Sequence, residues 1–121
     1  MPYGQTKAVR VQQTVIAVRP GTWTRLEPTA SNVGINQAGQ TVTTPLANRF
    51  AVKIYCRGGA AVGSRAGISY TNAVGIKHAM HWIGSGQHVV EPADVGLTLW
   101  GRAKIVGSNN SMILVVTEYG A

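Results

Sequence analysis

Hydrophobic and polar residues form their clearest pattern near the C-terminal end of the chain, in two arms at residues 97–105 and 112–116. The first arm alternates between an apolar and a mostly polar face, with Leu97, Leu99, Ala103 and Ile105 opposite Thr98, Trp100, Arg102 and Lys104. The second arm is apolar at every position and rich in β-branched residues, which is typical of a strand covered on both faces. Residues 107–111, Gly-Ser-Asn-Asn-Ser, favour a chain reversal. The pattern therefore predicts a β-hairpin at the centre of a sheet.

A second alternating stretch covers residues 48–57. One face of this predicted strand is apolar and the other is polar and basic, with Phe50, Val52, Ile54 and Cys56 opposite Arg49, Ala51, Lys53, Tyr55 and Arg57. We expect the polar face to meet solvent or a partner. Cys56 is the only cysteine of the chain, so no intrachain disulfide can form, and we expect its thiol to be buried on the apolar face.

Shorter strands are expected in the rest of the chain. The patterns predict them within residues 7–18, 22–27, 40–44, 68–70, 74–79 and 81–90. No pattern predicts a helix of about ten or more residues. About seven to nine short strands at these spacings predict an all-β fold, an antiparallel β-sandwich or jelly roll. We expect residues 7–121 to form this single domain and residues 1–6 to form a flexible N-terminal arm.

Charged residues are scarce, at 12% of the chain against a usual ~25%. A surface with few ions costs little to desolvate, which favours permanent packing against other subunits. We expect some of these subunit contacts in the long polar connection at residues 29–47, because long loops in compact domains tend to carry function.

The charges that are present are mostly positive. Eleven Lys and Arg residues against four Asp and Glu residues give a formal net charge of +7. This excess attracts an acidic partner, such as nucleic acid, an anionic membrane or an acidic protein lattice. The cations are scattered along the sequence, so the sequence predicts no basic arm or tail.

Few residues are suited to catalysis. His78 and His81 have the H-x-x-H spacing of metal ligands on a helical turn, but in an extended segment their rings point to opposite faces. No Gly-x-Ser-x-Gly elbow presents a serine, and no glycine-rich loop carries the lysine of a phosphate site. We therefore expect no catalytic residue, no metal site and no cofactor. The N-terminal residues lack the apolar core of a signal peptide, so we expect synthesis in the cytoplasm and no membrane partner.

Several short motifs, in this order, resemble the small β-sandwich structural proteins of tailed-bacteriophage virions. They are T-W-T-R-L at residues 22–26, N-R-F-A-V-K-I at 48–54, V-E-P-A-D at 90–94, L-T-L-W-G-R-A at 97–103 and I-L-V-V-T-E-Y at 113–119. The resemblance spans most of the chain. It implies a non-enzymatic capsid decoration or cement protein in the virion, a homo-oligomer and often a trimer, which binds and stabilises the major capsid protein lattice. The heptads or glycine repeats of a fibre shaft are not seen.

The predicted partner-binding residues lie in the arm, in the long loop and on the polar strand faces. They are Tyr3, Lys7, Arg10, Asn36, Lys53, Arg57, Trp100 and Arg102. Two alternatives remain open. One is a tail, baseplate or fibre protein that binds carbohydrate by stacking on Trp82 or Trp100. The other is a small basic nucleic-acid-binding domain that uses Lys53, Arg57, Arg102 and Lys104, although the sequence shows only fragments of the required interleaving of aromatic and basic residues.

Overall fold

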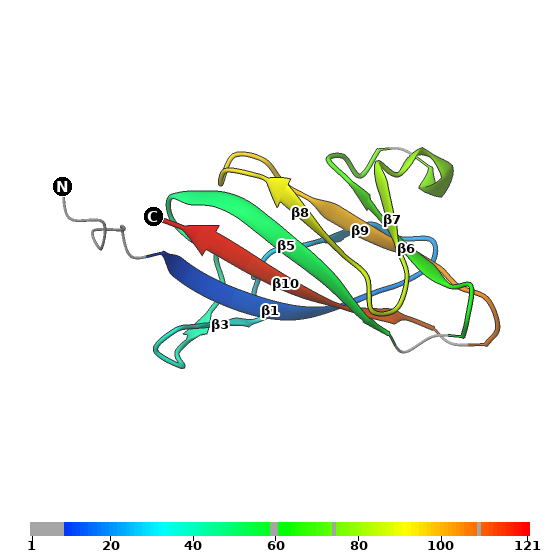
Figure 1. Cartoon of the computed structure of the whole chain (residues 1–121), viewed down its shortest axis with the longest axis horizontal. Helices are drawn as coiled ribbons and strands as arrows, with labels where there is room; N and C mark the ends of the chain where they lie inside the picture. The colour runs from blue at the N-terminus through cyan, green and yellow to red at the C-terminus, as the bar shows by residue number, and fades with distance from the viewer. Residues whose placement is uncertain (1–8, 59–60, 74, 109) are drawn as a thin grey trace.

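The computed structural model describes residues 9–58, 61–73, 75–108 and 110–121. In these ranges the chain forms ten β-strands and one 3-10 helix, η1 (Ile76–His78). The strands are β1 (Arg10–Val18), β2 (Thr24–Arg25), β3 (Gly34–Asn36), β4 (Thr41–Val42), β5 (Arg49–Gly58), β6 (Arg65–Ser69), β7 (His81–Ile83), β8 (His88–Pro92), β9 (Trp100–Lys104) and β10 (Met112–Gly120). The predicted all-β fold class is confirmed (Figure 1).

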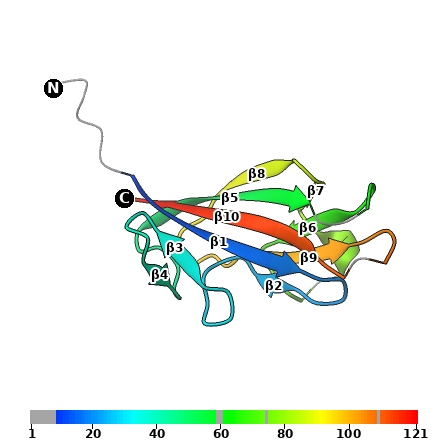
Figure 2. The ribbon, with the colours of Figure 1, turned by 90° about the horizontal axis from the view of Figure 1, so that it is seen from below.

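The strands form two antiparallel sheets that pack face to face as a sandwich. One sheet has six strands in the order β4-β3-β1-β10-β5-β8, and the other has four in the order β2-β9-β6-β7. Figure 2 shows β5, β10 and β1 side by side across one layer, with β9 and β2 on the far side of them. Each sheet therefore has one face toward the core and one face toward the outside.

The core lies between the two sheets. Alternate side chains of the long strands enter it from the six-stranded sheet, and β6, β7 and β9 meet them from the other side. Burying one large apolar side chain contributes about 1.5–3 kcal/mol. The buried cluster holds the two layers together and consists of Ile16, Val18, Leu26, Val52, Ile54, Cys56, Ala66, Ile68, Ile83, Ala93, Leu99, Ala103, Met112, Leu114 and Val116.

The two arms of the predicted C-terminal hairpin lie in different sheets. β9 belongs to the four-stranded sheet, whereas β10 lies between β1 and β5 at the centre of the six-stranded sheet. The predicted pairing of the arms is therefore wrong, although the central place of β10 is correct. Alternation specifies which face of a strand is buried, but it does not specify which sheet the strand joins. Both arms bury their apolar faces in the same core, from opposite sides.

β10 is buried on one face only. Met112, Leu114 and Val116 have no exposed surface, whereas Ile113 and Val115 on the other face are half-buried. The prediction that both faces of this strand are covered is wrong for the single chain. An apolar run of this kind normally belongs to a strand with cover on both sides.

A β-bulge at the start of β5 reverses two of the predicted orientations. Tyr119 pairs with Ala51 and Gly120 pairs with Arg49, so Phe50 is an extra residue in the ladder. As a result Phe50 is 51% exposed and Arg49 is only 3% exposed. The predicted faces hold from Val52 onward but are wrong for these first two residues.

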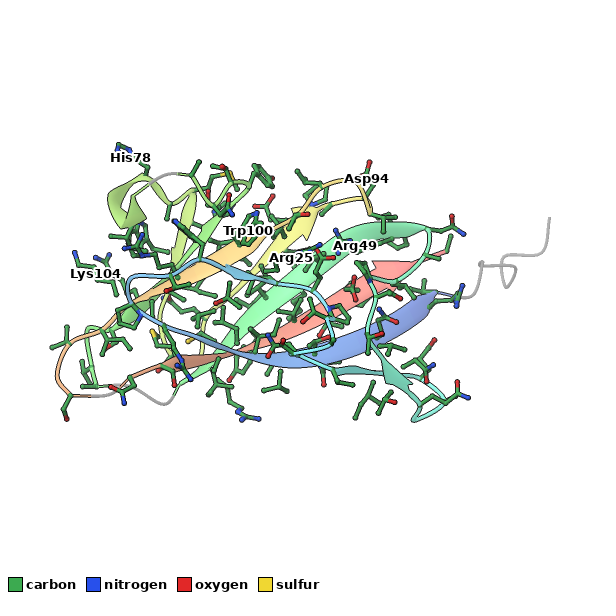
Figure 3. The ribbon with its side chains drawn as sticks, turned by 180° about the vertical axis from the view of Figure 1, so that it is seen from behind. Arg25, Arg49, His78, Asp94, Trp100 and Lys104 are labelled. Carbon is green, nitrogen blue, oxygen red and sulfur yellow. The ribbon has the colours of Figure 1, made fainter. Side chains whose placement is uncertain are left out.

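Arg49 points inward because it forms a buried ion pair with Glu118. Arg49 Nη1 lies 2.9 Å from Glu118 Oε2, and both side chains are almost fully buried. The remaining polar atoms of the pair are satisfied: the guanidinium donates to the carbonyl oxygens of Ala93, Asp94 and Leu97, and the carboxylate accepts from Gln12 Nε2 and from the backbone N–H of Leu46. The network joins β5, β10 and β1 to two loops, at the end of the sandwich where Figure 3 labels Arg49 and Asp94.

The shorter predicted elements match the structure unevenly. Strands are present in residues 7–18, 22–27 and 40–44, although β2 and β4 have only two residues each. Residues 74–79 were expected as a strand and instead contain η1. The predicted N-terminal arm, residues 1–6, lies outside the described residues.

Candidate functional site

Three of the four carboxylates are turned into the protein. Glu118 is 0% exposed, Glu27 3% and Glu91 8%. Glu27 pairs with Arg25 at 3.3 Å, and Glu91 accepts a hydrogen bond of 2.6 Å from the Tyr70 hydroxyl and contacts His81 Nε2. Asp94 is the exposed carboxylate of the chain. The excess of cations given by the sequence is therefore even larger on the molecular surface.

The outer face of the four-stranded sheet carries all three tryptophans of the chain together with four cations. Direct strand pairing places Arg25 beside Trp100, Arg102 beside Gly67, and Arg65 beside Lys104. Paired residues in an antiparallel sheet share a face. We call this surface the tryptophan–arginine face and define it by Trp23, Arg25, Arg65, Trp82, Trp100, Arg102 and Lys104.

Two of the arginines on this face stack on tryptophans. The guanidinium carbon of Arg65 lies 4.9 Å from the centroid of the Trp82 ring, and that of Arg102 lies 5.8 Å from the Trp23 ring. Such cation–π contacts contribute about 0.5–1 kcal/mol at exposed sites. Within the described part of the chain, Arg102 Nε is buried without a hydrogen-bond partner. These contacts therefore help to hold the two arginines beside the tryptophans.

One turn covers part of the tryptophan–arginine face. A Cβ added at Gly67 would lie 2.8 Å from Ala79 Cβ and 3.0 Å from Ile76 Cδ1, so the segment around η1 packs directly on β6. The strands β2 and β9 remain uncovered beside this turn. In Figure 3 Arg25 and Trp100 lie next to each other, Lys104 lies farther along β9, and His78 marks the turn. The open part of the face therefore follows β2 and β9.

The outer face of the six-stranded sheet is mostly apolar. Val15 pairs with Val115, which pairs with Tyr55, and a neighbouring row runs from Gln13 through Thr117 and Lys53 to Val90. Val15 is 46% exposed and Val90 is 54% exposed. We call this surface the apolar sheet face and define it by Val11, Gln13, Val15, Ile35, Lys53, Tyr55, Arg57, His88, Val90, Ile113, Val115, Thr117 and Tyr119. No carboxylate occupies an outward position on the described residues of β1, β3, β5, β8 and β10.

The predicted partner-binding residues lie in three separate places. Lys53 and Arg57 lie on the apolar sheet face, and Trp100 and Arg102 lie on the opposite, tryptophan–arginine face. Arg10 and Asn36 line a groove of about 390 Å³ where β1 meets β3. Tyr3 and Lys7 lie outside the described residues.

The sequence reasoning missed Arg25 and Arg65 as site residues. The alternation in residues 97–105 did place Trp100, Arg102 and Lys104 on one face, and that face is confirmed. The other members come from β2 and the residue before it, from β6 and from β7, and nothing in the sequence showed that these strands share a sheet with β9. Predicting the whole face would have required the order of the strands in the sheet.

The residues considered for catalysis lie on different elements: Cys56 on β5, His78 on η1 and His81 on β7. Cys56 is fully buried, and its burial raises the pKa of the thiol above its ordinary value. His78 is exposed on η1, while His81 contacts Glu91. The hydrogen bond to Glu91 raises the pKa of the Tyr70 hydroxyl, with smaller contributions from burial and charge.

The described ranges contain no group of three or more His, Cys, Asp or Glu side chains that could hold a metal ion. They also contain no helix long and apolar enough to cross a membrane. No protein-family model, curated protein or solved structure matches this chain.

Proposed function

We propose that this chain is a non-enzymatic virion structural protein, a capsid decoration protein that binds and stabilises the major capsid protein lattice. The observation that carries the proposal is the apolar sheet face. At this face the central strand of the larger sheet, β10, has no cover, although its sequence is typical of a strand that is covered on both faces. A partner subunit would supply the second cover.

The size and charge of the apolar sheet face support a protein partner. Strands spaced ~4.8 Å apart and rising ~3.3 Å per residue give the five strands from β3 to β8 an area of about 600 Å² in outline. A stable interface takes about 800 Å² of accessible surface from each partner, so this face is of the required order. Its described charges, Lys53 and Arg57, are both positive. They would suit carboxylates on an acidic shell subunit.

We propose the major capsid protein as the partner because the sequence motifs resemble those of phage virion β-sandwich proteins. Three of these motifs, at residues 48–54, 97–103 and 113–119, largely coincide with β5, β9 and β10. The proposal includes a homo-oligomer, with a trimer favoured, whose copies occupy repeated sites in the virion. Sedimentation equilibrium of the purified protein tests this part, because a single-chain mass at all concentrations would contradict it.

Binding to nuclease-treated, DNA-free capsids tests the main proposal. The protein should cosediment with such capsids, and Val15→Asp or Val90→Asp should lower the bound amount at least tenfold, because each places a carboxylate on the apolar sheet face. Val62→Asp is the matched control, since Val62 is 99% exposed and lies in the loop before β6. A protein that ignores capsids, or binds them equally well with either of the two face variants, would contradict the proposal. Location of the protein in the tail rather than on the shell would also contradict the decoration role.

A further inference from the structure

We infer that the tryptophan–arginine face is a binding site for single-stranded nucleic acid. This inference goes beyond the capsid role, because the face lies on the side of the sandwich opposite the apolar sheet face. Proteins that bind single strands without sequence preference combine cations that follow the backbone with aromatic side chains that stack on bases. The structure assembles both kinds of group on one sheet surface.

The charge of the face favours an anionic ligand. Arg25, Arg65, Arg102 and Lys104 project from it, and Glu27, which pairs with Arg25, is only 3% exposed. Uncharged carbohydrate would use the tryptophans but would gain nothing from the positive charge of the face. A polyanion uses both.

The stacked arginines are prepared to bind phosphate groups. The guanidinium carbons of Arg65 and Arg102 lie over the rings of Trp82 and Trp23, at 4.9 and 5.8 Å from the ring centroids, and these contacts restrict the two side chains. A guanidinium fixed in this way loses less side-chain entropy when it binds a phosphate. Lys104 is exposed at the open end of β9 and adds a mobile charge to the same surface.

Trp100 is the main candidate for base stacking. It is half-buried on β9, between Arg25 on one side and Ser69 on the other. Ser69 is 2% exposed, and the segment around η1 packs on Gly67, which lies on the same face of β6. The uncovered surface along β2 and β9 is therefore a strip with a wall on one side, which suits an extended single strand.

Duplex DNA fits this surface poorly. Its major groove admits an α-helix or a two-stranded ribbon that projects from the protein. Here the cations and tryptophans lie on the broad face of a four-stranded sheet with the η1 turn rising beside them. Base stacking on Trp100 also requires unpaired bases.

Fluorescence anisotropy with a labelled oligothymidylate of about 15 nucleotides tests the inference. Binding should weaken steeply with salt, by about 0.7 in log–log slope for each phosphate contacted. Trp100→Ala should weaken binding about tenfold or more. Lys104→Gln should reduce the salt slope by about 0.7, whereas the matched control Lys53→Gln, on the apolar sheet face, should leave it unchanged.

Three results would overturn the inference. One is an unchanged affinity in Trp100→Ala, because bases would then not stack on Trp100. Another is an equal loss of affinity in Lys104→Gln and Lys53→Gln, because the oligonucleotide would then be attracted to the positive charge of the whole protein and not to this face. The third is competition by polyglutamate as strong as that by oligothymidylate of equal charge, since the site would then accept any acidic polymer. Near-ultraviolet circular dichroism of each variant shows whether the fold is retained, and Trp100→Phe provides a second test if Trp100→Ala unfolds.

Discussion

Breaking the buried Arg49–Glu118 pair should destabilise the protein strongly. In Glu118→Gln the guanidinium of Arg49 keeps its three carbonyl acceptors but loses its counter-charge, while its side chain is 1% exposed. Removing one partner of a buried pair costs about 3–5 kcal/mol. Because Arg49 keeps its hydrogen bonds to the carbonyl oxygens, we expect a loss near the lower end of this range, at about 3 kcal/mol. At ~2.1 cal/mol/K of unfolding entropy per residue, this loss lowers the Tm by about 12 °C.

Arg49→Met should cost more than Glu118→Gln. It leaves the Glu118 carboxylate buried with the two donors from Gln12 and Leu46. It also removes the guanidinium donor from the carbonyl oxygens of Ala93, Asp94 and Leu97, of which Asp94 O still accepts from the Leu97 backbone N–H. The expected loss is about 4–5 kcal/mol. The double variant Arg49→Met/Glu118→Leu should lose less than the sum of the single variants, by at least ~1.5 kcal/mol, because it removes both charges together.

Urea unfolding followed by circular dichroism measures these losses, with m-values to check that unfolding stays two-state. Arg57→Met serves as the control, because Arg57 is exposed and should change stability by less than about 0.5 kcal/mol. A loss below about 1 kcal/mol in either single variant would refute the reasoning. So would strict additivity in the double variant, since the network would then not act as a unit.

Three further predictions concern the core, the bulge and one glycine. Cys56 should resist thiol-reactive reagents until the protein unfolds. Because the pKa of its thiol is raised in the folded state, the free energy of unfolding should fall as the pH rises past the ordinary thiol value of 9.0. Urea unfolding of Cys56→Ala should not show this loss of stability at alkaline pH. Phe50→Lys should change the Tm by only a few degrees, since Phe50 is 51% exposed, whereas Val52→Lys should abolish the folded circular dichroism spectrum. Gly120→Ala should cost about 1–3 kcal/mol in urea unfolding, because its Cβ would lie 3.0 and 3.1 Å from backbone oxygens, while Gly75→Ala, with nothing within 4 Å, should be nearly neutral.

Local alternation predicted the faces of β5 and β9 well where the strands are regular. From Val52 to Cys56 the buried positions are those expected, and Trp100, Arg102 and Lys104 share the outer face as expected. The orientation of Arg49 could not be predicted, because it depends on Glu118, which lies 69 residues away. Local pattern contains no information about such a partner.

The candidate surfaces show the same limit. Each tryptophan of the tryptophan–arginine face lies in a different stretch of the sequence, and the strand order β2-β9-β6-β7 brings them together. The sequence therefore contains the tryptophans and cations of this face, but it does not show that they lie together. The apolar sheet face was indicated by the apolar run in β10.

The place of β10 in the sheet has a consequence for how the protein is made. β10 follows the other nine strands in the chain and pairs with β1 over Arg10↔Gly120 to Val18↔Met112, as well as with β5. During synthesis β1 and β5 therefore leave the ribosome before the strand that joins them, and their inward apolar residues stay open to water until β10 has been made. Contacts between such distant segments also form slowly. Truncation before residue 112 should therefore yield aggregates instead of a smaller domain.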